Sequence, residues 1–134
     1  MKRIIIYCDG AARGNPGPAG AGALLLDANG SVLDEVAKYL GETTNNQAEY
    51  QALILAINAA QTLGAESVEI FADSELMVRQ IKGIYRVKND GLKPLFKLIM
   101  KKLEGFSEYQ ITHVPREKNM HADKLANKAI DERL

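Results

Sequence analysis

The stretch Ile4-Ile5-Ile6-Tyr7-Cys8-Asp9-Gly10 is the part of the sequence that decides the predicted fold. Its five apolar or aromatic residues in a row are typical of a short buried strand. A segment rich in glycine and proline follows over residues 9–18, so we expect the strand to end at Asp9. The strand would then carry a carboxylate at the rim of the hydrophobic core.

Length and composition set the class of protein. With 134 residues, of which 46% are hydrophobic, the chain can fill one core, and we expect a single domain over residues 1–134. Seventeen basic and seventeen acidic residues give a formal net charge of zero, which excludes a cationic field over the whole surface. The one cysteine, Cys8, cannot form an intramolecular disulfide, so we expect a reducing compartment, the cytoplasm. We expect a monomer without membrane association.

Changes in hydrophobic period divide the rest of the chain into strands and helices. Predicted strands cover residues 3–8, 19–26, 31–40, 67–72 and 108–114. Predicted helices begin near residues 44, 74, 92 and 122, and residues 44–47 have the form of a capping box. The order βββαβααβα predicts an α/β fold, in which a five-stranded mixed sheet with its first three strands antiparallel is flanked by helices.

Four acidic residues stand at the ends of these elements. Asp9 and Asp73 end strands, whereas Glu49 and Asp123 lie in the first turns of helices. If the first and fourth strands are parallel neighbours, Asp9 and Asp73 lie side by side at the edge of the sheet where α/β folds bind ligands. Any one of these residues alone is more simply explained as a turn or helix-capping residue, so the argument depends on the set of four.

A cluster of carboxylates without histidine or cysteine indicates a particular chemistry. The negative charges repel one another unless a cation neutralises them. Ligand sets made only of oxygen suit Mg²⁺, with Mn²⁺ as a substitute. Two such ions, roughly 3.5 to 4 Å apart, can activate a water and stabilise the leaving oxygen in phosphodiester hydrolysis. The cluster therefore predicts metal-dependent phosphoryl chemistry with two Mg²⁺ ions.

Five motifs together resemble those of the type 1 ribonuclease H family, in a short form without the family's extra basic protrusion. They lie at residues 7–11, 14–18, 43–49, 71–74 and 119–126. The resemblance implies the ribonuclease H-like fold and endonucleolytic cleavage of the RNA strand of RNA/DNA hybrids, giving 5′-phosphate and 3′-hydroxyl ends. Asp9, Glu49, Asp73 and Asp123 match the family's four catalytic, metal-binding carboxylates.

The resemblance also implies a set of substrate-binding residues around the four acids. Backbone groups and polar side chains near the acids match positions that contact the RNA strand, whose 2′-hydroxyl marks it as RNA. These positions are Gly10, Ala12, Asn15, Asn45 and Gln47. Thr44 matches a position that holds a DNA-strand phosphate, although Thr44 and Asn45 are equally well explained as helix caps.

The loop before Asp123 departs from the pattern of many family members, which carry a histidine there in a longer loop. Arg116 is our candidate for that place, because an arginine can hold a phosphate although it cannot act as a base. We predict an auxiliary role for Asn119. His113 and His121 are predicted to lie outside the chemistry, in a strand and on a solvent-facing helix surface.

Positive charge is concentrated in one segment. Residues 79–102 contain eight basic residues and one acid, which leaves this segment at +7 and the remainder of the chain at −7. We interpret the segment as a handle that follows phosphates, with Tyr85 packing on a deoxyribose and Asn89 bonding a phosphate. The competing interpretation is a solvated helix surface, because Lys93, Lys97 and Lys101 repeat every four residues.

Two other functions stay open beside ribonuclease H activity. A catalytically weak module that binds hybrids or duplexes would not need four intact acids. Another nuclease of the ribonuclease H-like superfold is a further alternative, but its exonucleases carry Asp-x-Glu in the first strand, where this chain has Asp9-Gly10-Ala11. Double-stranded RNA is open as a second substrate.

Overall fold

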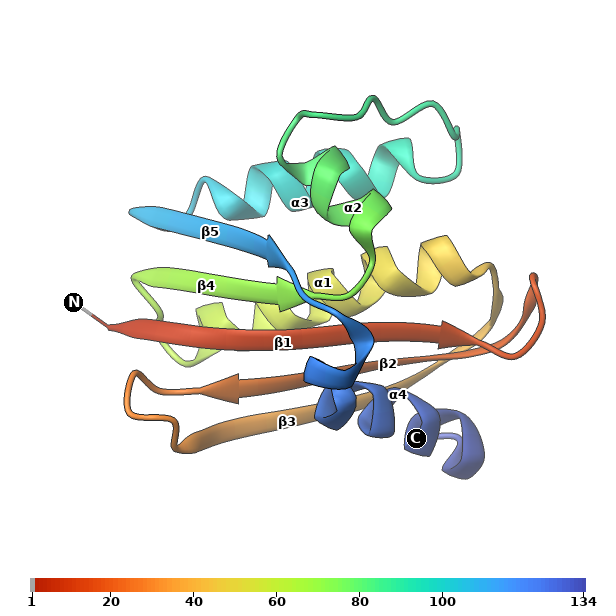
Figure 1. The fold of residues 1–134 in the computed structure, drawn as a ribbon, viewed down its shortest axis with the longest axis horizontal. Coiled ribbons are helices and arrows are strands. Elements are labelled where there is room, and N and C mark those ends of the chain that lie inside the picture. Colours follow the sequence, from red (N-terminus) through yellow and green to blue (C-terminus); the bar gives the residue numbers. More distant parts are fainter. Residues whose placement is uncertain (1) are drawn as a thin grey trace.

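The computed structural model describes residues 2–134, which form a mixed sheet with helices on both of its faces (Figure 1). In chain order the elements are β1 (Arg3–Ala12), β2 (Gly17–Leu26), β3 (Val32–Thr43), α1 (Asn45–Thr62), β4 (Ser67–Ala72), α2 (Glu75–Ile81), α3 (Lys93–Leu103), β5 (Glu108–His113), the short 3-10 helix η1 (Arg116–Lys118) and α4 (Met120–Glu132). The predicted order of strands and helices is confirmed, with η1 as the unpredicted addition.

The strand order in the sheet is β3-β2-β1-β4-β5. Strand β1 is antiparallel to β2 and parallel to β4, and the last pair on the β4 side is Cys8 with Ala72. The prediction of parallel neighbours is therefore confirmed, and Asp9 and Asp73 each come directly after this pair.

The predicted end of the first strand at Asp9 is wrong. Strand β1 continues to Ala12, because it stays paired with β2 as far as Ala12 and Ala19, four residues beyond its last pair with β4. Asp9 thus lies where β1 parts from β4 and remains bonded to β2 alone. Such a divergence at the carboxyl ends of parallel strands opens a crevice, which is where ligands bind in α/β sheets.

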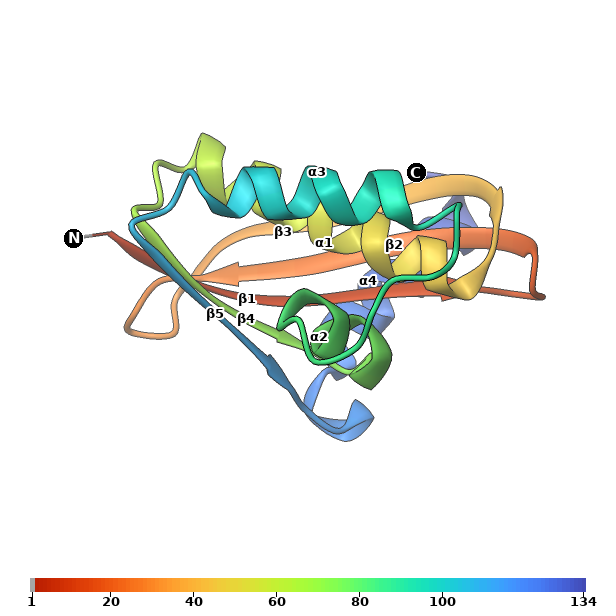
Figure 2. The ribbon, with the colours of Figure 1, turned by 90° about the horizontal axis from the view of Figure 1, so that it is seen from above.

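Helices α1 and α3 cover one face of the sheet, and α4 packs on the other (Figure 2). The alternate residues Ile4, Ile6 and Cys8 of β1 are at most 1% exposed and belong to the core under α1. Ile5 and Tyr7 point to the other face and are half-buried, with the Tyr7 ring stacked on Phe71. The first strand is therefore fully buried on one face only.

Two glycines let the helices approach the sheet closely enough to reach the crevice. A Cβ on Gly10 would lie 2.2 Å from the backbone carbonyl of Ala48 in α1. A Cβ on Gly22 would lie 2.3 Å from the backbone oxygen of Ala122 in α4. Because real Cβ contacts are not this short, both helices sit where only glycine permits, with Glu49 and Asp123 one residue further along.

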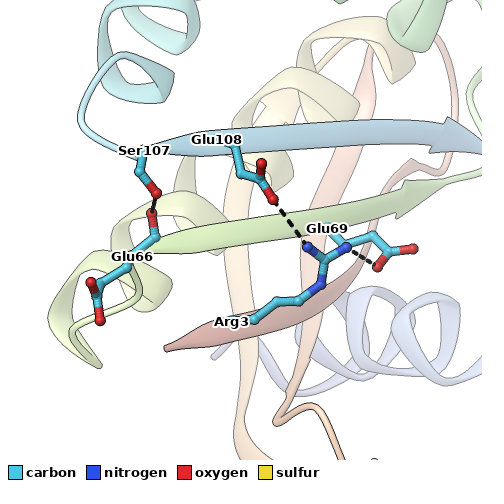
Figure 3. Close-up of polar contacts among 5 residues, drawn as sticks. All are labelled: Arg3, Glu66, Glu69, Ser107 and Glu108. Carbon is cyan, nitrogen blue, oxygen red and sulfur yellow. Dashed lines mark hydrogen bonds and ion pairs between the residues drawn. The ribbon is translucent and has the colours of Figure 1, made fainter. Parts of the chain in front are cut away.

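The opposite ends of the strands are tied by polar contacts (Figure 3). The guanidinium of Arg3 in β1 donates to Glu69 in β4 at 2.5 Å and lies 3.5 Å from a carboxylate oxygen of Glu108 in β5. The hydroxyl of Ser107 donates to the backbone carbonyl of Glu66. These contacts connect the three parallel strands at their amino ends, and the crevice lies at the opposite, carboxyl ends.

None of the helices within residues 2–134 combines the length and the apolar character needed to cross a lipid bilayer.

Candidate active site

Three carboxylates from different elements converge in the crevice between β1 and β4. Asp9 comes from β1, Glu49 from α1 and Asp73 from the turn after β4, and each offers an oxygen within 4.8 Å of the other two. Asp9 is 4% exposed and Glu49 is 6% exposed. Three negative charges at this separation, screened poorly by water, repel one another strongly.

Local sequence places the last two of these acids. Thr44 caps α1 by accepting a hydrogen bond from the N–H of Gln47, so Glu49 lies in the second turn with its backbone against Gly10. The capping box is only half formed, because the Gln47 side chain accepts from the hydroxyl of Thr43 and does not reach back to Thr44. Ser74 caps α2 by accepting from Met77, which holds Asp73 in the turn between β4 and α2.

Burial and repulsion change the acidity of the cluster. Burial, followed by the charges of Glu49 and Asp73, raises the pKa of Asp9 well above its usual value. Burial also raises the pKa of Glu49, against the opposing effect of its hydrogen bond with Asp9. The pKa of the Cys8 thiol is raised by burial and then by the neighbouring acids, so Cys8 is a protonated core residue and no thiolate ligand.

The donor set fits a hard divalent cation. The Oε2 atom of Glu49 is buried and has no hydrogen-bond partner, which is costly for a charged oxygen unless a cation or proton satisfies it. The three convergent groups are all carboxylates, which are the ligands that Mg²⁺ and Mn²⁺ prefer. Asp9, Glu49 and Asp73 are thus the residues that would hold such an ion.

Asp123 approaches the same pocket from α4, outside the group of three. Its side chain is 25% exposed, and its Oδ2 lies 3.9 Å from the guanidinium of Arg116. Asn119, which is buried, donates from its amide to the carbonyl of Cys8 at 2.9 Å, and its backbone carbonyl accepts from the N–H of Asp123. Asn119 therefore fastens the start of α4 to the residue that precedes Asp9.

The pocket brings together the four predicted acids and some of the predicted substrate-binding residues. Its lining consists of Asp9, Gly10, Ala11, Ala12, Arg13, Asn45, Glu49, Asp73, Arg116, Asp123 and Asn127. Asn15 is exposed and is not part of this lining, and its Oδ1 accepts the N–H of Asn45 at 3.0 Å. Gln47 also stays outside, with its amide packed beside Gly91.

Tyr85 and Asn89 lie apart from the pocket, in the loop over residues 82–92. Tyr85 is 46% exposed, and the guanidinium of Arg79 sits 5.4 Å from its ring centre. The Oδ1 of Asn89 accepts from the N–H groups of Gly91 and Leu92, so this side chain shapes the entry to α3. A second, basic pocket beside this loop is lined by Arg86, Val87, Lys88, Lys93, Phe96 and Lys97.

The two histidines lie outside the pocket lining. His113 ends β5 with an exposed side chain. His121 is 51% exposed at its side chain, but it pairs with Glu35 of β3 and does not simply face solvent.

Three residues of the lining are absent from the predicted site, namely Ala11 and the two polar residues Arg13 and Asn127. Asn127 follows Asp123 by four residues, which places both on one face of α4. This spacing is the signal that the sequence offered for Asn127. Arg13 gave no signal, because its contacts are with residues more than 110 positions away.

The comparisons with known proteins agree with one another. A family model described as reverse transcriptase-like matches residues 7–129. Ribonuclease HI of Halobacterium salinarum is 42% identical over 97% of this chain. The crystal structure of RNase H1 from that halophilic archaeon matches with a TM-score of 0.95 and 42% identity, covering 97% of this chain and 98% of the other. LC11-RNase H1, isolated from compost and solved in complex with RNA/DNA hybrid, matches at 48% identity and a TM-score of 0.92, covering 97% and 98%.

Several of the curated relatives are much longer than this chain. The chain spans 65% of the length of the Halobacterium relative and 36% of the length of others.

The raised pKa of Asp9 predicts how stability depends on pH without metal. Because its pKa is raised, Asp9 binds a proton more tightly in the folded state than in the unfolded state. The contribution of this proton to the free energy of unfolding is complete below the unfolded pKa of about 3.9. It is lost as the pH rises toward the folded pKa. In EDTA at pH 8, Asp9→Asn should therefore be more stable than the unsubstituted protein by more than about 1 kcal/mol. Urea unfolding at pH 5 and pH 8 measures this, and the advantage of the variant should shrink at pH 5.

Asp34→Asn, on the exposed edge strand β3, is the matched acid-to-amide control and should show no advantage in stability over the unsubstituted protein at either pH. Equal stability of Asp9→Asn and the unsubstituted protein at both pH values would contradict the repulsion described above.

Proposed function

The chain belongs to the type 1 ribonuclease H family, and on that premise we propose that it is a metal-dependent endonuclease that hydrolyses the RNA strand of RNA/DNA hybrids. The observation that carries the proposal is the convergence of Asp9, Glu49 and Asp73 within 4.8 Å, with Asp123 in the same pocket. A module that only binds nucleic acid has no use for this repulsive cluster. The relative solved with an RNA/DNA hybrid supports the same substrate class.

The four carboxylates have distinct proposed roles. Asp9, the most buried of the four acids, would contribute to holding both cations. Glu49 and Asp73 would complete the position nearer the leaving group, whereas Asp123 would serve the position near the attacking water. When bound, two divalent ions supply Lewis acidity that activates the water and stabilises the leaving oxygen, which yields 5′-phosphate and 3′-hydroxyl ends.

The residues that surround the acids have proposed substrate contacts. Gly10 and Ala12 would offer backbone groups to the RNA strand, and Asn45 an amide from the first turn of α1. Asn15 would act in part by holding Asn45 in place, since their hydrogen bond is already formed. We assign Gln47 to the RNA strand and Thr44 to a phosphate of the DNA strand, each beside its capping or packing role.

Arg116 is the proposed phosphate ligand nearest the acids. Its side chain is 79% exposed and lies 3.9 Å from Asp123, so it is free to swing toward a scissile phosphate or its product. Because arginine stays protonated at all working pH values, its role is electrostatic and does not include proton transfer. Asn119 is an auxiliary residue that keeps α4 on β1 through the Cys8 carbonyl.

The basic segment is the proposed grip on the rest of the duplex. Its loop and α3 gather Arg86, Lys88, Lys93 and Lys97 around one pocket, where their charges would reinforce one another toward a phosphate. Tyr85 would pack on a sugar, and the amide nitrogen of Asn89 would bond a phosphate while its oxygen shapes the turn. This arrangement favours the handle interpretation over a merely solvated helix surface.

The working metal ion, the oligomeric state and the location in the cell are further parts of the proposal. We propose that Mg²⁺ is the working ion with Mn²⁺ as a substitute, that the single domain acts as a monomer, and that it works in the cytoplasm. Double-stranded RNA is a second substrate to be tested.

Cleavage of a hybrid whose RNA strand carries a label at an internal position tests the proposed activity. With Mg²⁺ the protein should cut within the RNA strand, and EDTA should abolish the cutting. Asp73→Asn should lower kcat by more than about 100-fold, because losing a direct ligand should cost more than the 10- to 100-fold typical of outer residues. Asp34→Asn is the matched acid-to-amide control and should leave kcat unchanged.

The pattern of products separates the alternatives. Release of nucleotides only from strand ends would indicate an exonuclease of the same superfold. Tight binding of the hybrid without turnover would indicate a binding module, and either result contradicts the proposal.

The salt dependence of hybrid binding tests the proposed contacts between the basic segment and the phosphates. In the Asp73→Asn background, which should not cut the probe, Lys97→Ala should reduce the slope of log K against log salt by about 0.9, the value for one lost phosphate contact. Fluorescence anisotropy with a labelled hybrid measures the slope. Lys38→Ala on β3 is the matched control, and a slope that changes equally in both variants would contradict a localised grip.

A further inference from the structure

A chain of hydrogen bonds leads from the end of β1 to the carboxylate of Asp123. The guanidinium of Arg13 donates to the Oδ1 of Asn127 at 3.2 Å. The amide nitrogen of Asn127 donates to Oδ1 of Asp123 at 3.3 Å and to the Asp123 backbone carbonyl at 3.0 Å. Arg13 and Asn127 both line the pocket of the four acids, yet neither belongs to the set proposed above.

The hydrogen-bond partners of Asn127 allow only one orientation of its side-chain amide. A guanidinium can only donate hydrogen bonds, so the amide oxygen must face Arg13. The amide nitrogen must then face Asp123, whose carboxylate and carbonyl can only accept. A reversed amide would put donor against donor and acceptor against acceptor.

Arg13 is itself held from two sides. Its guanidinium pairs with Asp131, one further turn along the same face of α4, and its backbone N–H donates to the carbonyl of Pro18. The guanidinium also lowers the pKa of Asp131, so this partner stays charged. The orientation of the Asn127 amide therefore depends on the turn after β1, the strand that also carries Asp9.

Asp123 has less support from burial than Asp9 or Glu49 has. Asp9 and Glu49 are fixed by burial, whereas the Asp123 side chain is 25% exposed and lies outside the group of three. With Oδ1 engaged by Asn127, the remaining oxygen, Oδ2, is the one that faces Arg116 at 3.9 Å. A carboxylate held by one oxygen presents the other in a defined direction, as outer-shell hydrogen bonds do for metal ligands.

We propose that Asn127, oriented by Arg13, is a positioning residue that holds Asp123 in the geometry for cation binding. The inference rests on the proposed function, because it assigns Asp123 to a cation. It adds a connection between two acids of the site, since Arg13 directly follows β1, the strand that carries Asp9. A simple tie between the β1–β2 turn and α4 would need only the Arg13–Asp131 pair.

Binding of Mn²⁺ to the substrate-free protein tests the proposal. Asn127→Leu keeps the side-chain size and removes the amide, and it should weaken Mn²⁺ binding about tenfold, as measured by the electron paramagnetic resonance signal of free Mn²⁺. At limiting metal its kcat on the hybrid should fall about 10- to 100-fold with KM for the hybrid unchanged, and added metal should restore part of the loss. Arg13→Met should act in the same direction, and the double variant should lose no more than Asn127→Leu alone.

Two variants on α4 distinguish positioning of the Asp123 carboxylate from a simple connection between the β1–β2 turn and α4. Asp131→Asn removes the charge pair but leaves the Arg13–Asn127 bond, so it should change Mn²⁺ affinity by less than twofold. Glu132→Gln, on the exposed end of α4, should leave affinity and activity unchanged. The melting temperature in EDTA shows whether each variant is folded.

The proposal is overturned if Asn127→Leu binds Mn²⁺ as the unsubstituted protein does, or if Asp131→Asn weakens binding as much as Asn127→Leu. Failure of the proposed function gives a different result. In that case Mn²⁺ affinity would still depend on Asn127, while the unsubstituted protein would cut no hybrid.

Discussion

The repulsion among Asp9, Glu49 and Asp73 is the constraint on which the rest of the structure depends. Their oxygens lie within 4.8 Å of one another, and Asp9 and Glu49 are almost fully buried, so the folded chain must hold together groups that repel. The parting of β1 from β4 provides the place, and Gly10 lets α1 come close enough to deliver Glu49. A rigid frame of this kind costs stability unless a cation or proton neutralises it, and it is therefore prepared for cation binding.

The distribution of charge follows from the same constraint. A zero net charge first argues against a nucleic-acid partner, but it is the sum of a +7 segment at residues 79–102 and a −7 remainder that contains the four acids. In the proposed function, the acids would act with bound cations, and the basic loop and α3 would attract the phosphates. The two pockets share no lining residue, so the lysines and arginines of the basic pocket would not neutralise the acids that are proposed to hold metal. Two cationic side chains line the pocket of the acids. Arg13 is paired with Asp131, and Arg116 is exposed and lies 3.9 Å from Asp123.

Much of this architecture was predictable, because it depends on local pattern. The apolar run before Asp9 and the helical periods gave the element order. The predicted parallel pairing of the first and fourth strands gave the proximity of Asp9 and Asp73, which both follow the last pair of β1 with β4. The true end of β1 could not be predicted, since it is set by pairing with β2 on one side only. Asn15 was predicted as a substrate contact, but its bond to Asn45 is tertiary and left no periodic signal. The same holds for Arg13, whose partners lie at the other end of the chain.

Proton release on metal binding tests the central claim most directly. Titration calorimetry with Mg²⁺, repeated at pH 7 in two buffers of different ionisation enthalpy, counts the protons that leave when the ion binds. Because burial and repulsion raise the pKa of both Asp9 and Glu49, we expect Mg²⁺ to displace protons from the cluster, so that the apparent enthalpy differs between the buffers. Binding with the same enthalpy in both buffers, or no binding of Mg²⁺ at all, would contradict the account.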